Sequence, residues 1–70
     1  MELLIIKKKN VYVRIKEERY LFVGLDKASV FPLEKLTTVQ GHIKTLQARG
    51  FKNVSLYRLK MTEEPYQEPV

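Results

Sequence analysis

The fold class is decided by the stretch Val11-Tyr12-Val13-Arg14-Ile15-Lys16. β-Branched residues alternate there with tyrosine and charged residues, so one side of an extended chain is apolar and the other side is polar. This period of two is typical of a half-buried β-strand. The neighbouring runs 3–7 and 20–23 are also rich in strand-favouring residues, and polar turns at 7–10 and 16–19 separate the three runs. Residues 2–24 therefore predict an antiparallel meander, with Asn10 available for a positive φ in the first turn.

A helix is predicted after Pro32, which suits a first helical position because its missing N–H costs nothing there. The pattern from Thr37 to Gln40 also matches a capping box, so a later start is an alternative. Gly50 is placed to end the helix in a left-handed conformation. The residues that recur at helical spacing form one stripe, namely Leu33, Leu36, Val39, Gln40, Ile43, Leu46 and Gln47.

A closing strand is expected over 54–59, and a short edge strand over 29–31. The predicted fold class is α+β, a small antiparallel β-sheet in the order β-β-(β)-α-β with one amphipathic helix packed on one face. We expect a single α+β domain over residues 1–60. The stretch 61–70 holds two prolines and three glutamates, and we expect it to be a disordered acidic tail.

Charge and composition narrow the classes of function. Residues 1–60 carry 13 Lys and Arg against 5 Asp and Glu, a net charge of 13 − 5 = +8, and the last ten residues lower the total to +5. Such a basic body can attract nucleic acid or an acidic protein surface, although excess lysine also serves solubility. Cysteine is absent and no apolar run approaches the roughly 18 residues that span a bilayer, so we expect a cytoplasmic protein without membrane contact.

The side chains that catalysis requires are scarce. His42 is the only histidine, Asp26 the only aspartate, and Ser29 and Ser55 the only serines. His42 lies roughly opposite the apolar stripe, where we expect it to be solvated. With no cysteine and no second histidine, a zinc site has no plausible ligands, and isolated glycines make no phosphate loop. We therefore expect no enzyme, no cofactor and no metal.

One helix covers only one face of a sheet. The covered face is expected to hold Val11, Val13, Ile15, Leu21, Val23, Val54 and Leu56. The opposite face is expected to be an interaction face made of Leu4, Ile6, Tyr12, Tyr20, Phe22 and Tyr57. Aromatic residues interleaved with cations suit single-stranded nucleic acid, since rings stack on bases while cations meet phosphates. The candidate phosphate contacts are Lys7, Lys8, Lys9 and Arg14, with Tyr12 and Tyr20 as candidates for stacking.

Two further surfaces could hold a partner. The run at 3–6 is apolar throughout, so one pair of its side chains points away from the helix and predicts association through that face, with homodimerisation favoured in isolation. On the outward side of the helix, small residues follow one another at three- and four-residue spacing. This candidate docking ridge consists of Thr38, Gly41, Thr45 and Ala48.

The segment Asp26-Lys27-Ala28, followed by Phe31, Glu34 and a helix, and then by Gly50-Phe51 and Val54, resembles small uncharacterised proteins of Gram-positive phages and integrated mobile elements. The resemblance covers about half the chain and implies no functional residues. From the residues themselves we expect a non-enzymatic binding or interaction protein with a protein partner or a second copy. The alternatives are a nucleic-acid-binding protein that uses a basic, aromatic sheet face, and a self-associating structural protein.

Overall fold

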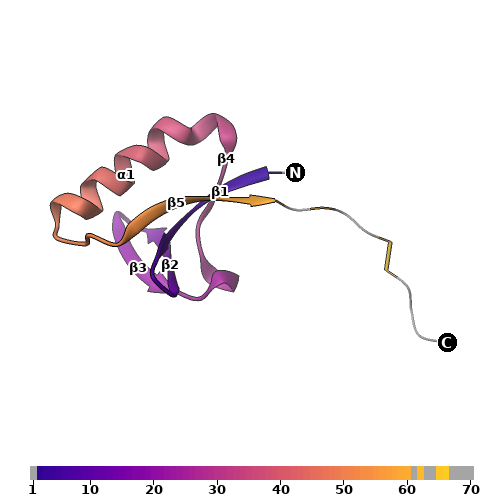
Figure 1. Cartoon of the computed structure of the whole chain (residues 1–70), viewed down its shortest axis with the longest axis horizontal. Coiled ribbons are helices and arrows are strands. Elements are labelled where there is room, and N and C mark those ends of the chain that lie inside the picture. The colour runs from indigo at the N-terminus through magenta and orange to yellow at the C-terminus, as the bar shows by residue number, and fades with distance from the viewer. Residues whose placement is uncertain (1, 61, 63–64, 67–70) are drawn as a thin grey trace.

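A computed structural model describes residues 2–60, 62 and 65–66. In that part of the chain, five strands and one α-helix confirm the α+β class (Figure 1). Most of the predicted tail, 61–70, lies outside the described residues. The elements are β1 (Glu2–Lys8), β2 (Val11–Lys16), β3 (Arg19–Val23), a 3₁₀ turn (Leu25–Lys27), β4 (Val30–Pro32), a second 3₁₀ turn (Leu33–Lys35), α1 (Leu36–Ala48) and β5 (Val54–Lys60).

β1 is the central strand of the sheet. Along one edge it pairs antiparallel with β5 over its full length, from Glu2 opposite Lys60 to Lys8 opposite Val54. The other edge is shared, because β4 pairs with residues 3–5 and β2 pairs with residues 7–8. β2 then pairs with β3, which confirms the predicted meander. Figure 1 shows α1 running across one face of this sheet, above β5 and β1.

The core lies between α1 and the face of the sheet that α1 covers. Val39 and Leu46 of α1 are fully buried. The half-buried Ile43 lies between them in the sequence, about one helical turn from each. The strands contribute Leu4, Ile6, Val13 and Val54 to the same cluster. Alternation along each strand places these side chains on one face, so the sequence period of two accounts for the core.

Helical structure begins at Leu33, which confirms the earlier of the two predicted starts. The first turn is 3₁₀, with about three residues per turn rather than 3.6, so it does not keep the phase of the α-helix that follows. Leu33, which lies in this turn, was expected on the buried stripe but is exposed, and so is Leu36, the first residue of α1. At the other end, Gly50 has φ 98° as predicted, and the N–H of Phe51 donates to the Leu46 carbonyl at 3.1 Å, which closes a Schellman cap.

The expected placement of Tyr20 and Phe22 on the uncovered face is wrong. In the β2–β3 hairpin, Tyr20 lies directly opposite Ile15 and Phe22 lies directly opposite Val13. Residues directly opposite each other in an antiparallel pair point to the same side of the sheet, so both aromatic residues share the face that α1 covers. Leu21 and Val23, expected in the core, consequently point to the outer face.

The expected interaction face is also wrong for Leu4 and Ile6, which are buried beneath α1. Ile5 points the other way, and only 2% of it is exposed because Tyr57 and Val30 lie opposite it on the two neighbouring strands. Pairing on both edges of β1 therefore covers much of the predicted apolar patch. What remains exposed there is about half of Tyr57 and of Val30.

Candidate anion-binding site

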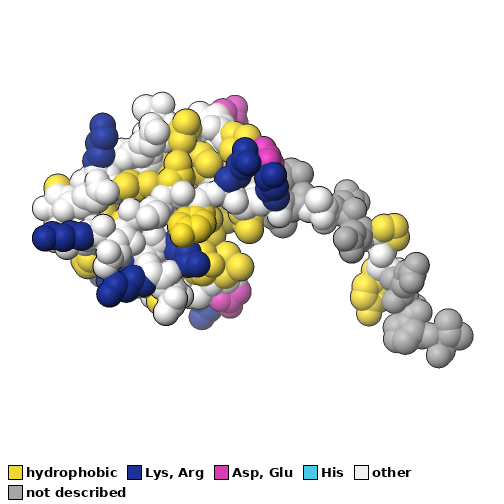
Figure 2. All heavy atoms as spheres, viewed as in Figure 1, with side chains coloured by type: hydrophobic (Ala, Val, Ile, Leu, Met, Phe, Trp, Pro, Cys, Tyr) yellow, Lys and Arg dark blue, Asp and Glu magenta, His cyan; other side chains and the backbone are white. Residues whose placement is uncertain are grey.

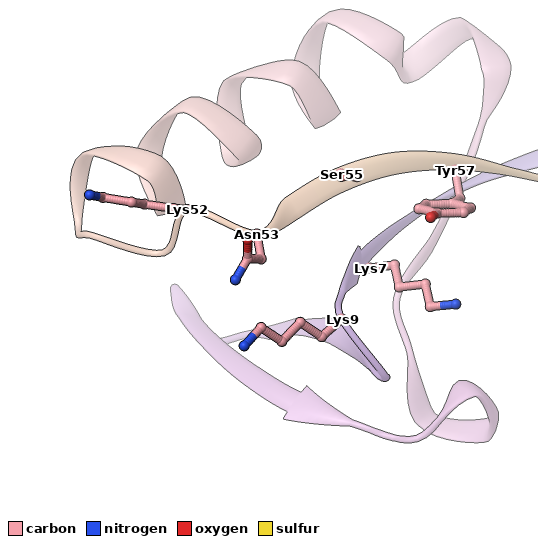
Figure 3. Close-up of a pocket in the computed structure, with 6 residues that line it drawn as sticks. All are labelled: Lys7, Lys9, Lys52, Asn53, Ser55 and Tyr57. Atoms are coloured by element: carbon pink, nitrogen blue, oxygen red, sulfur yellow. The ribbon is translucent and has the colours of Figure 1, made fainter.

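A hollow of about 360 Å³ opens on the outer face of the sheet, where the β1–β2 turn meets the loop between α1 and β5 (Figure 3). Its lining holds three lysines, three polar side chains and no carboxylate. These residues are Lys7, Lys9, Lys52, Asn53, Ser55 and Tyr57. We call this set the lysine hollow.

The register of β1 and β5 assembles the lysine hollow from distant parts of the chain. Lys7 lies opposite Ser55, and Tyr57 is two residues farther along β5 on the same face. The same pairing brings the 52–53 loop beside the turn at 9–10. The Schellman cap at Gly50 contributes as well, because it turns the chain directly from α1 into this loop.

The ammonium group of Lys7 contacts two tyrosine rings. Lys7 Nζ lies 5.5 Å from the centroid of the Tyr12 ring and 5.2 Å from that of the Tyr57 ring. A cation this close to an aromatic face is attracted by the negative charge of the ring face, by about 0.5–1 kcal/mol at exposed sites. Because 49% of Tyr57 is exposed, this end of the hollow offers a cation and an aromatic ring to solvent together.

The other cations lie at the opposite end. In Figure 3, Lys9 and Lys52 extend away from Lys7, and Asn53 points into the space between them. The positive charges of the hollow are thus spread along its length rather than gathered at one point. This spacing suits an extended anion with several charges better than a single small one.

Lys9 has φ 53°, which places it, and not Asn10 as expected, in the left-handed region of the β1–β2 turn. For a residue with a Cβ, that conformation costs about 1–2 kcal/mol. The turn keeps the conformation because Lys8 must pair with Val11 across a connection of only two residues.

The structure brings together only some of the residues proposed for phosphate contact. Lys7 and Lys9 line the hollow, whereas Lys8 points to the opposite face, with its Nζ 4.8 Å from the Phe22 ring centroid and 5.4 Å from that of Phe51. Arg14 lies opposite Leu21 and does not line the hollow.

Tyr20, proposed for stacking, faces α1 instead. Its hydroxyl shares a hydrogen bond of 2.8 Å with Nδ1 of His42, and the guanidinium of Arg49 lies 5.1 Å from its ring centroid. His42 is therefore half-buried and hydrogen-bonded, and the expectation that it would be solvated is wrong.

Sequence reasoning missed Lys52, Asn53 and Ser55. Their place follows only from the pairing of β5 with β1, because a strand that runs antiparallel to β1 begins next to the place where β1 ends. The polar loop before it then lies beside the 7–10 turn.

The candidate docking ridge is exposed along its whole length. The hydroxyl of Thr45 donates to the Gly41 carbonyl at 3.0 Å, so this polar group is satisfied within the helix. A partner for the ridge stays a prediction.

Within residues 2–60, 62 and 65–66, no group of three or more His, Cys, Asp or Glu side chains could hold a metal ion. No helix of this described part is long and apolar enough to cross a membrane. No protein-family model, curated protein or solved structure matches the chain.

Proposed function

We propose that this chain is a non-enzymatic cytoplasmic protein that binds single-stranded nucleic acid along the lysine hollow. The observation that supports the proposal is the placement of Lys7 between the rings of Tyr12 and Tyr57, with Lys9 and Lys52 farther along the same surface. In this arrangement the lysines meet phosphates while an exposed ring stacks on a base.

A single strand fits the surface better than a duplex does. Bases of a single strand are free to stack on aromatic side chains, whereas a duplex keeps its bases stacked on one another. Tyr57 points to the outer face beside Lys7, and no helix of the described residues lies on this face to enter a groove (Figures 1 and 3). The proposed strand runs from Tyr57 and Lys7 toward Lys9 and Lys52.

Electrostatics favours a polymer over a small anion. The only ion pair among the described residues joins Arg58 and Glu2, so none of the three lysines of the hollow has a carboxylate within 4 Å in that part of the chain. Each phosphate that a lysine neutralises releases counterions, which gives a polymer an entropic gain that a single small anion lacks.

The test is titration of a fluorescein-labelled oligothymidylate of about 12 nucleotides, followed by anisotropy between about 20 and 150 mM salt. Three phosphate contacts predict a slope of log affinity against log salt of about −2, since each contributes about −0.7 on a single strand. Lys52→Gln should weaken binding and make the slope shallower by about 0.7. The matched control is Lys16→Gln, an exposed lysine outside the hollow, which should leave the slope unchanged.

Stacking is tested separately at Tyr57. Tyr57→Phe keeps the ring and should keep the affinity, whereas Tyr57→Leu keeps apolar cover over Ile5 but should lose about 1–3 kcal/mol of binding. Absence of binding at low salt, or equal losses from Lys52→Gln and Lys16→Gln, would contradict the proposal.

Self-association through the outer face stays a prediction. Val30, Tyr57 and Leu21 are exposed apolar side chains of that face that it would use. Sedimentation of the free protein at high concentration decides it, because a monomer excludes a homodimer of useful affinity.

A further inference from the structure

Among the strands that the structure describes, β5 lies at an edge of the sheet and its outer edge has no strand partner. It pairs only with β1, and no backbone or side-chain hydrogen bond of the described residues involves its other edge. Seven residues is long for an exposed edge, which proteins usually shorten, bulge or cover. The free edge therefore offers a row of backbone donors and acceptors for another strand.

A groove of about 400 Å³ follows the same edge on the side of α1. Its apolar floor comes from Ile43 of α1 and Leu56 of β5, and its rim is formed by Gln40, Lys44 and Gln47. Figure 2 shows hydrophobic side chains reaching the surface along the line between α1 and β5. This groove is separate from the lysine hollow, because Leu56 points toward α1 while Ser55 and Tyr57 point to the outer face.

A strand added to the free edge of β5 would pair with the β5 backbone and at the same time place some of its side chains against the groove. Side chains alternate along a strand, so every second residue of the added strand would point toward α1. The one opposite Leu56 would enter the apolar groove. The next ones on that face would lie opposite Arg58 and Lys60, which share the inner face of β5 with Leu56.

Charge decides which strand fits. Lys44, Arg58 and Lys60 place cations along the groove and the adjoining part of β5, and the carboxylate they meet among the described residues is that of Glu2, 3.6 Å from Nε of Arg58. The β5 strand of a second copy of this chain has cations and no carboxylate, so it would add positive charge to this edge rather than neutralise it. An acidic strand would instead meet opposite charges.

We propose that the outer edge of β5 docks an extended acidic segment of another protein as an additional antiparallel strand. The segment carries two acidic residues and one apolar residue at alternate positions, in the order acidic-x-acidic-x-apolar. The apolar side chain fills the groove between Ile43 and Leu56, and the acidic ones pair with Lys60 and Arg58. Backbone hydrogen bonds supply affinity, while the groove and the cations supply specificity, as in other complexes formed by strand addition.

The test uses a blocked synthetic peptide, Ser-Glu-Thr-Glu-Thr-Val-Ser, titrated into the ¹⁵N-labelled full chain and followed by NMR. Its control, Glu-Ser-Glu-Thr-Thr-Val-Ser, has the same composition but places the acidic side chains on the opposite face from valine. The first peptide should shift the amide signals of β5 and of residues 40–47 and should slow hydrogen exchange at alternate residues of β5. The control should bind at least tenfold more weakly, and so should the first peptide methylated on its backbone nitrogens.

Among variants of the protein, Lys44→Glu should bind the first peptide at least tenfold more weakly than the parent chain does. Lys16→Glu, which changes the net charge by the same amount, should bind it as the parent does. Equal binding of the two peptides, or signal changes confined to Lys7, Lys9 and Lys52, would overturn the proposal, since acidic peptides would then merely be drawn to lysines. A homodimer through β5 in the absence of peptide would overturn the choice of occupant. These outcomes are independent of oligonucleotide binding at the hollow.

Discussion

The hydroxyl of Tyr20 in β3 and Nδ1 of His42 in α1 lie 2.8 Å apart and share a hydrogen bond. The two rings meet edge to face, with centroids 5.7 Å apart. This contact ties β3, at one side of the sheet, to the middle of α1. His42 follows Val39 by three residues and precedes Leu46 by four, so it flanks the buried side of the helix, where the Tyr20 ring covers it.

Removing the hydroxyl should therefore destabilise the fold. We expect Tyr20→Phe to lower the free energy of unfolding by about 0.5–1.5 kcal/mol, the usual net value of one hydrogen bond, because Nδ1 of His42 loses its partner. Chemical denaturation measures the loss. Tyr12→Phe is the control, since Tyr12 makes no side-chain hydrogen bond in the described structure. Equal stability of Tyr20→Phe and the parent chain would show that the bond does not form in solution.

The two apolar helix residues Leu46 and Ile43 should contribute unequally to stability, although both belong to the predicted apolar stripe. Leu46→Ala should cost about 2–5 kcal/mol, because Leu46 is fully buried and its truncation leaves a cavity. Ile43→Ala should cost clearly less, since Ile43 borders the open groove beside β5. Thermal and urea unfolding of both variants gives the order. A larger loss at Ile43 than at Leu46 would mean that the helix is rotated relative to the sheet.

The alternation of β2 was sufficient to predict its own buried face, but the faces of β3 depended on the turn. Glu17 and Glu18 both have positive φ, so two residues connect the strands and Ile15 lies opposite Tyr20. The break at 16–19 was recognised in the sequence, but its length was not used to set the register. A shift of one residue exchanges the two faces, which is why Leu21 and Tyr20 were placed the wrong way round.

The two helix-associated glycines should respond in opposite directions to alanine. Gly41 lies in the interior of α1, and apart from the adjoining backbone of its own helix and its chain neighbours nothing lies within 4 Å of the position that an added methyl group would take, so Gly41→Ala should stabilise by up to about 1 kcal/mol through helix propensity. Gly50 has φ 98°, and Gly50→Ala should cost about 1–2 kcal/mol because a Cβ strains that conformation. The shift in denaturation midpoint measures both. A loss at Gly41 would indicate that the open helix face meets a partner closely.

The lysine hollow was only half predictable. Lys7 and Lys9 stand out as a basic turn, and Tyr57 as an outward strand residue. Lys52, Asn53 and Ser55 join them only through the pairing of Lys7 with Ser55, which links residues 48 positions apart. Local pattern carries no information about that register. The burial of Ile5 was missed for the same reason, since it depends on strands pairing with both edges of β1.

Lys9 combines a strained backbone with a place in the hollow, and these two properties can be separated. Backbone strain is commonly retained where a residue has a function. Lys9→Gly relieves the positive φ, so we expect the free energy of unfolding to rise or stay level, with the relief of about 1–2 kcal/mol offset in part by the greater flexibility of glycine. Oligothymidylate binding should weaken at the same time, and its salt slope should become shallower by about 0.7, because one phosphate contact is lost. Glu18→Gly is the matched control, since Glu18 has φ 63° in the other hairpin and lies outside the hollow. That change should relieve strain without weakening binding.

A Lys9→Gly chain that unfolds more easily than the parent would show that the lysine side chain stabilises the turn. Unchanged affinity in Lys9→Gly would exclude Lys9 from the phosphate path.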